Sequence, residues 1–470
     1  MEQALKFREH LLTQEPKSLI WMLCFILGLS YTLYSIGLII YRLTFHPLAR
    51  FPGPFLCRIG YLQQCYYEAI LNGKFFEKIP EYHRKYGPVV RINPNEVHIN
   101  DHLVFHEIYK QNSNFTKDPL SYALGVSHAM AFTIPIEEHK LKRQTLDPSF
   151  SKRRVNQMED GLYEELERVF DKINEYARKG ENVPIAELYF CYTGDIISRY
   201  LFGKSLNLIS APDFIEKAEQ MRSFTRGVWV SMHFPLIRSA ILSAPRWVVA
   251  FLSDAWVKVF WFCEDLAKQA IAQFDEERVD EKNPNEETIF DRLLLANSRR
   301  IEKGKKAKPL TFEELADESV ATLNAGTEPT ATMMTYATYF FLRFPEVQDG
   351  ILKELGSVEL DKHGRLPLQK VEGLPYFTGF VRETLRFMPL VPGRLPRTVP
   401  KGGLYVPAAN KTIPEGSIVG ISHLALHENP EIFTQPRKFL PERWIGKEGK
   451  ELNHWLLSFS KGRTDCIGKK

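Results

Sequence analysis

The residues best suited to chemistry lie near the end of the chain, in the stretch from Phe459 to Gly468. One cysteine, Cys466, stands there in a short loop, with glycines close by on either side at Gly462 and Gly468. Glycines let a backbone turn sharply and approach a flat cofactor closely. A thiolate presented in this way can be the axial ligand of a haem iron. The plainer interpretation is an ordinary glycine turn with a free cysteine, and the loop alone does not decide between them.

A second group lies inside a long predicted helix. A capping box at Thr311 and Glu314 opens this helix, which we expect to end near Phe344. Within it, the small residues Ala325 and Gly326 allow another group to pack against the helix.

An acid and an alcohol follow the small pair, at Glu328 and Thr330. Between them stands Pro329, which lacks an N–H group and predicts a kink at this point. Thr330 lies about 100° further round the helix than Pro329.

Charged side chains at helical spacing form a third group. His139 and Arg143 are four residues apart and share one face of a predicted helix, where a solvated basic surface is the plainer interpretation. Glu383 and Arg386 are three apart on another helix, and as a pair they are weak evidence of anything. The pair becomes stronger evidence of a functional motif because two further stretches follow it in the chain, the run Pro392–Arg397 and then a segment containing Arg443.

The order and separation of these stretches resemble those of the cytochrome P-450 family of haem-thiolate monooxygenases. The cysteine loop of that family reads F-x-x-G-x-R-x-C-x-G, and its fixed positions are matched here by Phe459, Gly462, Cys466 and Gly468. The chain departs from the pattern at Thr464, which stands where the family has arginine, with Arg463 one place early. It also departs at Pro329, which replaces a threonine of the family's A-G-x-D/E-T-T motif.

The resemblance implies roles for these residues. Cys466 would be the metal ligand of a haem b iron, in a loop shaped by Phe459 and Gly462. Haem propionates would be held by His139, Arg143 and Arg397. Protons for bound oxygen would pass through Glu328 and Thr330. A structural triad that locks the cysteine loop would consist of Glu383, Arg386 and Arg443.

The resemblance also implies a mainly α, triangular haem domain with small β-sheets. Its reaction would insert one oxygen atom of O₂ into a lipophilic small molecule, with electrons from an NADPH-dependent reductase. The hinge and the motifs most resemble those of microsomal enzymes of fungal secondary metabolism, which suggests terpenoids as one substrate class.

The elements that position these residues begin with a membrane anchor. Leu19 to Ile40 is 22 residues without a charge, long enough at about 1.5 Å per residue to span a bilayer core of roughly 30 Å. We therefore divide the chain into an N-terminal segment, residues 1–41, and a catalytic domain, residues 42–470. A proline-rich hinge at residues 45–54 joins them, and the alternating pattern of residues 89–99 predicts a hairpin.

Composition excludes other classes. The net charge is only +4, with 61 basic and 57 acidic side chains, so no polybasic nucleic-acid surface is expected. Six scattered cysteines without C-x-x-C spacing favour neither a zinc site nor a disulfide framework. Reduced thiols fit a domain that faces the cytosol. The resemblance to the P-450 family implies a single-pass protein of the endoplasmic reticulum with its catalytic domain in the cytosol.

The sequence ends two residues after Gly468. In the family, a helix that covers the proximal haem face and a later β-hairpin follow the cysteine loop. From their absence we expect poor retention of haem. The alternatives to an active enzyme are a truncated, inactive, membrane-anchored relic and a haem-binding protein without turnover.

Overall fold

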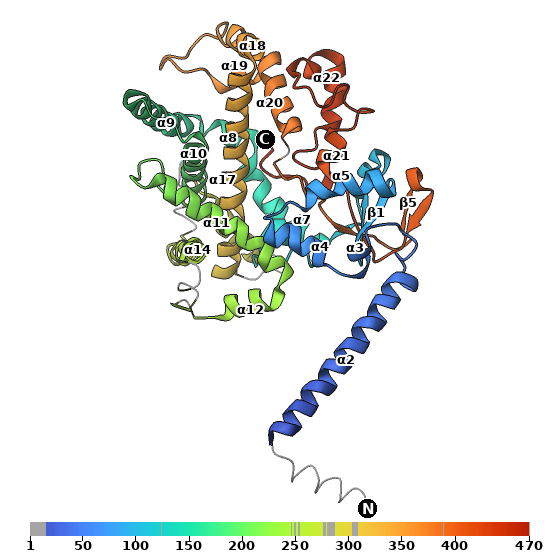
Figure 1. The fold of residues 1–470 in the computed structure, drawn as a ribbon. Coiled ribbons are helices and arrows are strands. Elements are labelled where there is room, and N and C mark those ends of the chain that lie inside the picture. The colour runs from blue at the N-terminus through green and yellow to red at the C-terminus, as the bar shows by residue number, and fades with distance from the viewer. Residues whose placement is uncertain are drawn as a thin grey trace, which may run out of the picture.

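A computed structural model of the chain describes residues 16–123, 125–245, 247–248, 251, 254–275, 279, 287–302, 309–388 and 390–469. Helices dominate the fold, and two small sheets lie on one side of the helical part (Figure 1). The predicted fold class is confirmed. The helices are α2 (Pro16–Thr44), α3 (Phe55–Ile59), α4 (Leu62–Cys65), the π-helical turn η1 (Tyr66–Ile70), α5 (Phe75–Tyr86), α6 (Phe105–Ile108), α7 (Ile136–Leu146), α8 (Lys152–Asn156), α9 (Glu159–Lys179), α10 (Ile185–Phe202), α11 (Phe214–His233), α12 (Pro235–Ser243), α14 (Asp254–Ala272), α16 (Ile289–Glu302), α17 (Phe312–Arg343), α18 (Pro345–Leu355), α19 (Leu368–Glu372), α20 (Pro375–Phe387), α21 (His423–His427) and α22 (Gly446–Leu452).

Helix α2 extends away from the rest of the molecule (Figure 1). Its segment Ile20–Thr44 contains an 18-residue window with a mean hydropathy of 2.0, and no residue of that window is buried. With 29 residues, α2 is about 44 Å long, which exceeds a bilayer core of about 30 Å. The helix is longer than the predicted span because it continues past the uncharged stretch at both ends.

The larger sheet joins distant parts of the chain. Its strand order is β1 (Val89–Asn93), β2 (Glu96–Ile99), β7 (Ile418–Gly420), β4 (Arg397–Thr398) and β3 (Thr116–Lys117). The predicted hairpin is the antiparallel pair β1–β2, and β2 then pairs in parallel with β7. A second sheet consists of β5 (Leu404–Val406) and β6 (Lys411–Ile413).

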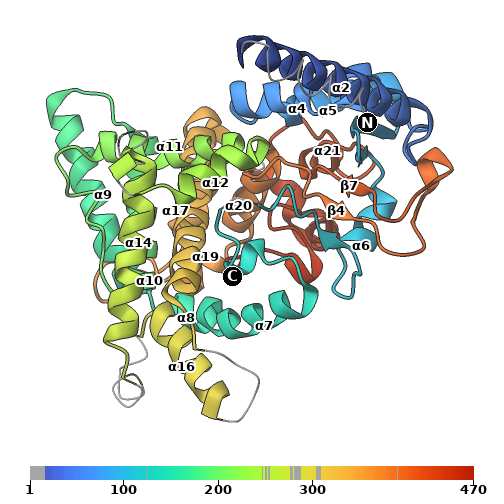
Figure 2. The ribbon, with the colours of Figure 1, turned by 90° about the horizontal axis from the view of Figure 1, so that it is seen from below.

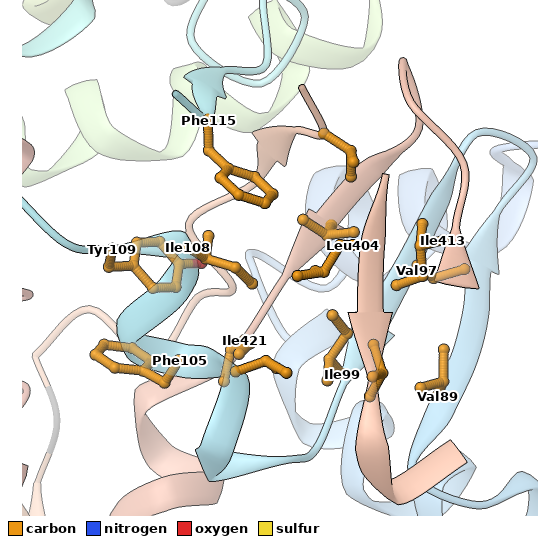
Figure 3. Packing of buried hydrophobic residues seen from close by; sticks show 14 of the residues in the cluster. Val89, Val97, Ile99, Phe105, Ile108, Tyr109, Phe115, Leu404, Ile413 and Ile421 are labelled. Atoms are coloured by element: carbon orange, nitrogen blue, oxygen red, sulfur yellow. The ribbon is translucent and has the colours of Figure 1, made fainter. Parts of the chain in front are cut away.

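An apolar cluster fills the space between the two sheets and α6 (Figure 3). The labelled side chains come from both sheets, from α6 and from the segments beside them: Val89, Val97, Ile99, Phe105, Ile108, Tyr109, Phe115, Leu404, Ile413 and Ile421. Burial of apolar surface on this scale stabilises the contact between early and late segments of the chain. It therefore fixes β3 and β4, which carry basic residues of the candidate site.

Helix α17 runs through the helical part of the molecule and packs against α10, α14 and α20 (Figures 1 and 2). Both hydrogen bonds of the predicted capping box are present at its start, between Thr311 and Glu314. The helix ends at Arg343, as predicted, and it continues as one element through Pro329.

The proline-rich hinge is fixed to strand β1. The Arg91 N–H donates to the Pro52 carbonyl at 2.7 Å, and a Cβ added at Gly53 would lie 2.1 Å from the Arg91 carbonyl oxygen. Only glycine therefore fits at position 53. The Arg91 side chain, 0% exposed, donates from Nη1 to the carbonyl of Arg42 in the last turn of α2, and from Nε and Nη2 to that of Pro94. A cation at a helix C-terminus is favourable, so Arg91 ties the end of α2 to the sheet.

Buried histidines are a further feature of the region around α21. Burial lowers the pKa of His423 to about 4 and that of His427 to about 3. The Leu457 N–H donates to His427 Nε2 at 3.0 Å, so this nitrogen must lack a proton. His98 is likewise fully buried and accepts from the Ser422 N–H at 3.0 Å.

These histidines predict that the fold is sensitive to acid. Below about pH 6.5 these histidines bind protons in the unfolded chain but stay neutral in the folded protein. The free energy of unfolding therefore falls as the pH falls from about 6.5 towards the folded pKa values. The His427→Gln variant keeps an acceptor but cannot be protonated. Between pH 7 and 5 it should lose about 2 kcal/mol less stability than wild type, measured by urea unfolding in detergent. His363→Gln, at an exposed position, is the control; equal losses in all three proteins would contradict the prediction.

Candidate active site

The cysteine loop is held in one conformation by backbone contacts. The Cys466 N–H donates to the Phe459 carbonyl at 2.8 Å, which closes the loop. Gly462 has φ +72°, and a Cβ there would lie 2.1 Å from the carbonyl oxygen of Tyr109. Only glycine can therefore bring the loop this close to the end of α6. Cys466 itself is exposed, so the loop presents its sulfur to a ligand.

The protonation of Cys466 follows from its surroundings. Nearby protein atoms partly desolvate the thiol even though it reaches solvent, and this raises its pKa above the usual value. The Asp465 carboxylate raises the pKa further, while the Gly468 N–H, Arg143 and Lys469 oppose the rise. A metal ion bound here would replace the thiol proton and supply the missing positive charge.

Basic side chains from four segments meet next to this loop. Arg143 of α7 forms an ion pair with Asp465, with Nη2 to Oδ1 at 2.7 Å. Arg397 of β4 donates to Thr464 Oγ1 at 3.0 Å and to the Tyr122 hydroxyl at 2.7 Å. Thr464, the residue that departs from the family pattern, thus accepts a hydrogen bond from a predicted propionate-binding arginine.

Lys117 of β3 adds a buried ammonium group to this cluster. It lies opposite Arg397 in the β3–β4 pair, where two like charges are unfavourable. Its Nζ donates to backbone carbonyls, at 2.7 Å to Ala131 and 3.1 Å to Thr133. Burial, and then the charges of Arg397 and Arg463, lower the pKa of Lys117 to about 7.

Two nitrogens of the cluster lack a hydrogen-bond partner among the described residues. Burial, and then the charges of Lys117 and Arg143, lower the pKa of His139 to about 3. His139 Nδ1 and Arg463 Nε are buried and have no hydrogen-bond partner in the part of the chain that the structure describes. Such groups are costly unless they are paired. This donor set fits the carboxylates of a haem, which would pair with the orphaned nitrogens.

The two small residues of helix α17 have different surroundings. A Cβ added at Gly326 would lie 2.6 Å from Ile197, so Gly326 packs against α10 rather than facing an open site. Ala325 is exposed. Pro329 has no N–H, so the Ala325 carbonyl four residues earlier lacks its usual partner within the helix.

Glu328 is held by neighbouring side chains. Its Oε2 accepts from Arg222 Nε at 3.0 Å, and its Oε1 accepts from the Thr332 hydroxyl at 3.3 Å. Arg222 also donates to Glu187 at 3.1 Å, so it links α11 to α10 and α17. Thr330 is exposed, and at 100° per residue it lies about 140° round the helix from Ala325. The structure thus brings Thr332, and not Thr330, to the acid.

Glu383 and its two arginines form a buried unit. Arg386 donates to Glu383 from Nη2 at 2.7 Å and from Nε at 2.9 Å, and Arg443 donates from Nε at 3.1 Å. Trp444 Nε1 and the Leu440 N–H also donate to this carboxylate, which is 0% exposed. Five donors on one carboxylate tie α20 to the segment that precedes the cysteine loop.

Comparison with known proteins identifies the family. The sequence model described as Cytochrome P-450 matches residues 51–470. Among similar curated proteins, the cytochrome P-450 monooxygenase BOT1 of Botryotinia fuckeliana is 31% identical, over 93% of this chain and 84% of its own length. Two others are also 31% identical: aneF of Aspergillus aculeatus, over 91% of this chain and 86% of its own, and sdnE of Sordaria araneosa, over 94% and 87%.

This chain is a cytochrome P-450. Family and relatives make it a monooxygenase of fungal secondary metabolism, with a haem iron bound by a cysteine thiolate. The family model starts at the hinge, so it covers the cysteine loop, the basic cluster and α17 but not the anchor helix.

Sequence reasoning missed several residues of this P-450 site. Lys117 and Tyr122 stand in no recognisable motif, and only the pairing of β3 with β4 brings them to Arg397. Arg222 likewise reaches Glu328 through the packing of α11. Thr332 could have been found, because it follows Glu328 by four residues on one helix face.

The geometry around Glu383 predicts a severe effect of its removal. The Glu383→Ala variant leaves two largely buried guanidinium groups without their carboxylate, which costs roughly 3–5 kcal/mol. This loss is comparable to the lower end of the stability of a whole domain. We expect aggregation or greatly increased protease sensitivity, together with loss of bound haem.

The matched control is Glu359→Ala, which removes an exposed partner of Lys370. This variant should behave like wild type in limited proteolysis and in the ratio of haem to protein. A Glu383→Ala protein with normal stability and haem content would show that the buried unit is dispensable.

Proposed function

We propose that this cytochrome P-450 inserts one oxygen atom of O₂ into a lipophilic small molecule, with two electrons from an NADPH-dependent reductase. The observation that carries the proposal is the exposed Cys466 on a fixed loop beside a basic cluster in which, among the described residues, only Arg143 has carboxylate partners. Terpenoids are the substrate class to test first, because they are lipophilic and belong to secondary metabolism.

We assign Cys466 as the axial ligand of a b-type haem. The haem, when bound, supplies the iron that activates O₂. The propionates would be held by the predicted residues His139, Arg143 and Arg397, and by two residues that the fold adds, Lys117 and Arg463. Phe459 and Gly462 shape the loop around the ligand.

We assign proton transfer to the Glu328 carboxylate. The Thr332 hydroxyl at Oε1 extends its hydrogen-bonded path, and Arg222 fixes its orientation through Oε2. The exposed Thr330 remains a predicted contributor. The Ala325 carbonyl, released from its helical partner by Pro329, provides an additional acceptor on the exposed side of α17.

We further propose that the protein is a single-pass protein of the endoplasmic reticulum with its catalytic domain in the cytosol. All six cysteines are free, as expected in a reducing compartment. Large apolar side chains are exposed on α3–η1 and in the region of α12, including Leu62, Ile70, Leu236 and Phe251. These regions would touch the membrane and admit lipophilic substrates. The sequence between residues 226 and 262 is rich in aromatic residues, and the side chain of one of them, Trp256, lies outside the described residues.

The test of the proposed activity is incorporation of label from ¹⁸O₂ by membranes that contain the protein and its reductase. The reduced, CO-bound protein should first show a thiolate-type Soret band. The Cys466→Ser variant should lose this band, whereas Cys65→Ser should keep it. No such band in wild type would favour the inactive relic, and a band without label incorporation would favour a haem binder without turnover.

The anchor proposal predicts a change in partitioning. Deletion of residues 1–41 should move most of the protein from membranes to the soluble fraction, because the segment contains the apolar part of α2. Deletion of residues 1–15 alone keeps this segment and should leave the protein membrane-bound. Carbonate-resistant retention of the longer deletion would place the anchor elsewhere.

A further inference from the structure

A buried polar cluster lies away from Cys466, where the end of α11 meets the sheet region. We call it the Glu68 cluster. It draws on the α4–η1 region, strands β1 and β2, the segment before β4 and the last residue of α11, and its members are Gln64, Glu68, Asn93, Glu96, Arg394 and His233.

Arg394 lies between two carboxylates. Its Nη1 donates to Glu68 Oε1 at 3.0 Å, and its Nε donates to Glu96 Oε1 at 2.5 Å. Gln64 donates to Glu68 Oε2 at 2.7 Å, and Asn93 donates to both Gln64 and Glu96. Without His233 the cluster therefore carries one positive and two negative charges.

His233 completes the cluster. Its Nε2 lies 2.8 Å from Glu68 Oε2. A carboxylate can only accept, so Nε2 carries the proton in this contact. Burial by itself raises the pKa of Glu68, but Arg394, His233 and Gln64 outweigh burial and lower it, so Glu68 is ionised.

Only His233 belongs to the segment formed by α11 and α12, which we call the lid. The lid extends from the helical part towards α4 (Figure 2). Among the described residues, two other contacts hold it there. The Trp229 ring packs on Gly73, where a Cβ would lie 3.0 Å from the ring, and Arg238 donates to the Ala123 carbonyl.

We propose that the contact between His233 and Glu68 is a latch that holds the lid against the sheet region and controls the entry of lipophilic ligands. The claim that the latch controls ligand entry rests on the proposed function, whereas the claim that the contact holds the lid does not. Glu68 is suited to reversible release, because Gln64 and Arg394 still hold it when His233 leaves. Its position in a π-helical turn, a feature often found at functional sites, agrees with such a role.

Hydrogen–deuterium exchange of the full-length, membrane-anchored protein in lipid nanodiscs tests the latch. The His233→Ala variant should speed exchange of amides between residues 228 and 243 by about tenfold, the effect of losing one hydrogen bond to a charged group. Amides of α17 should not change. His233→Gln keeps a donor and should retain most of the protection.

The matched control is Lys217→Gln, which breaks an exposed ion pair with Asp213 on the same helix and should have no effect. Unchanged exchange in His233→Ala would overturn the latch. So would exchange in His233→Gln as fast as in His233→Ala, because packing of the ring would then be the cause.

Ligand entry is measured separately, as the rate at which 4-phenylimidazole shifts the Soret band in stopped flow. Association and dissociation should both be faster by about tenfold in His233→Ala. Unchanged rates together with faster exchange would overturn control of entry. Because exchange needs no turnover, failure of the proposed oxygenase activity cannot be mistaken for failure of the latch.

Discussion

Uncompensated positive charge is the constraint on which the candidate site depends. Lys117, Arg143, Arg397 and Arg463 are gathered beside the cysteine loop together with the uncharged His139, and among the described residues only Arg143 has carboxylate partners, Asp465 and Asp147. Repulsion of this kind is strong where water is scarce. Folding tolerates it because the sheet, the apolar cluster and α7 hold these segments by other contacts. An acidic cofactor would then bind to a site whose donors are already in position.

The Glu383 unit shows how the fold supports such a site. Its carboxylate collects five hydrogen bonds and keeps α20 in contact with residues 440–444. The Ser458 hydroxyl then donates to the Leu385 carbonyl, so the start of the cysteine loop is tied to the same helix. Opposite charges stabilise this scaffold, whereas like charges crowd the neighbouring site. The scaffold can therefore form without the cofactor.

The sequence predicted local features well and long-range contacts poorly. The hairpin at residues 89–99, the capping box at Thr311 and the end of α17 depend on neighbouring residues, and the structure agrees with each. Gly326 was expected to let another group pack against the helix, but the sequence did not identify that group as Ile197, because the approach of α10 is set by tertiary packing. Arg222, which holds Glu328, and Tyr122 and Thr464, which hold Arg397, are remote in sequence from these residues. No periodicity or spacing identifies such partners without the fold.

Strand β1 connects the anchor to the lid. Arg91 points its guanidinium at the last turn of α2, and two residues later Asn93 donates to Gln64 and Glu96 in the Glu68 cluster. A strand of five residues that is buried throughout offers little freedom to move one contact without the other. Strand β1 thus fixes both the angle of α2 and the position of the Glu68 cluster that contacts the lid. For the membrane-anchored enzyme that we propose, this arrangement would keep the apolar surfaces of η1 and α12 in a constant orientation towards the lipid.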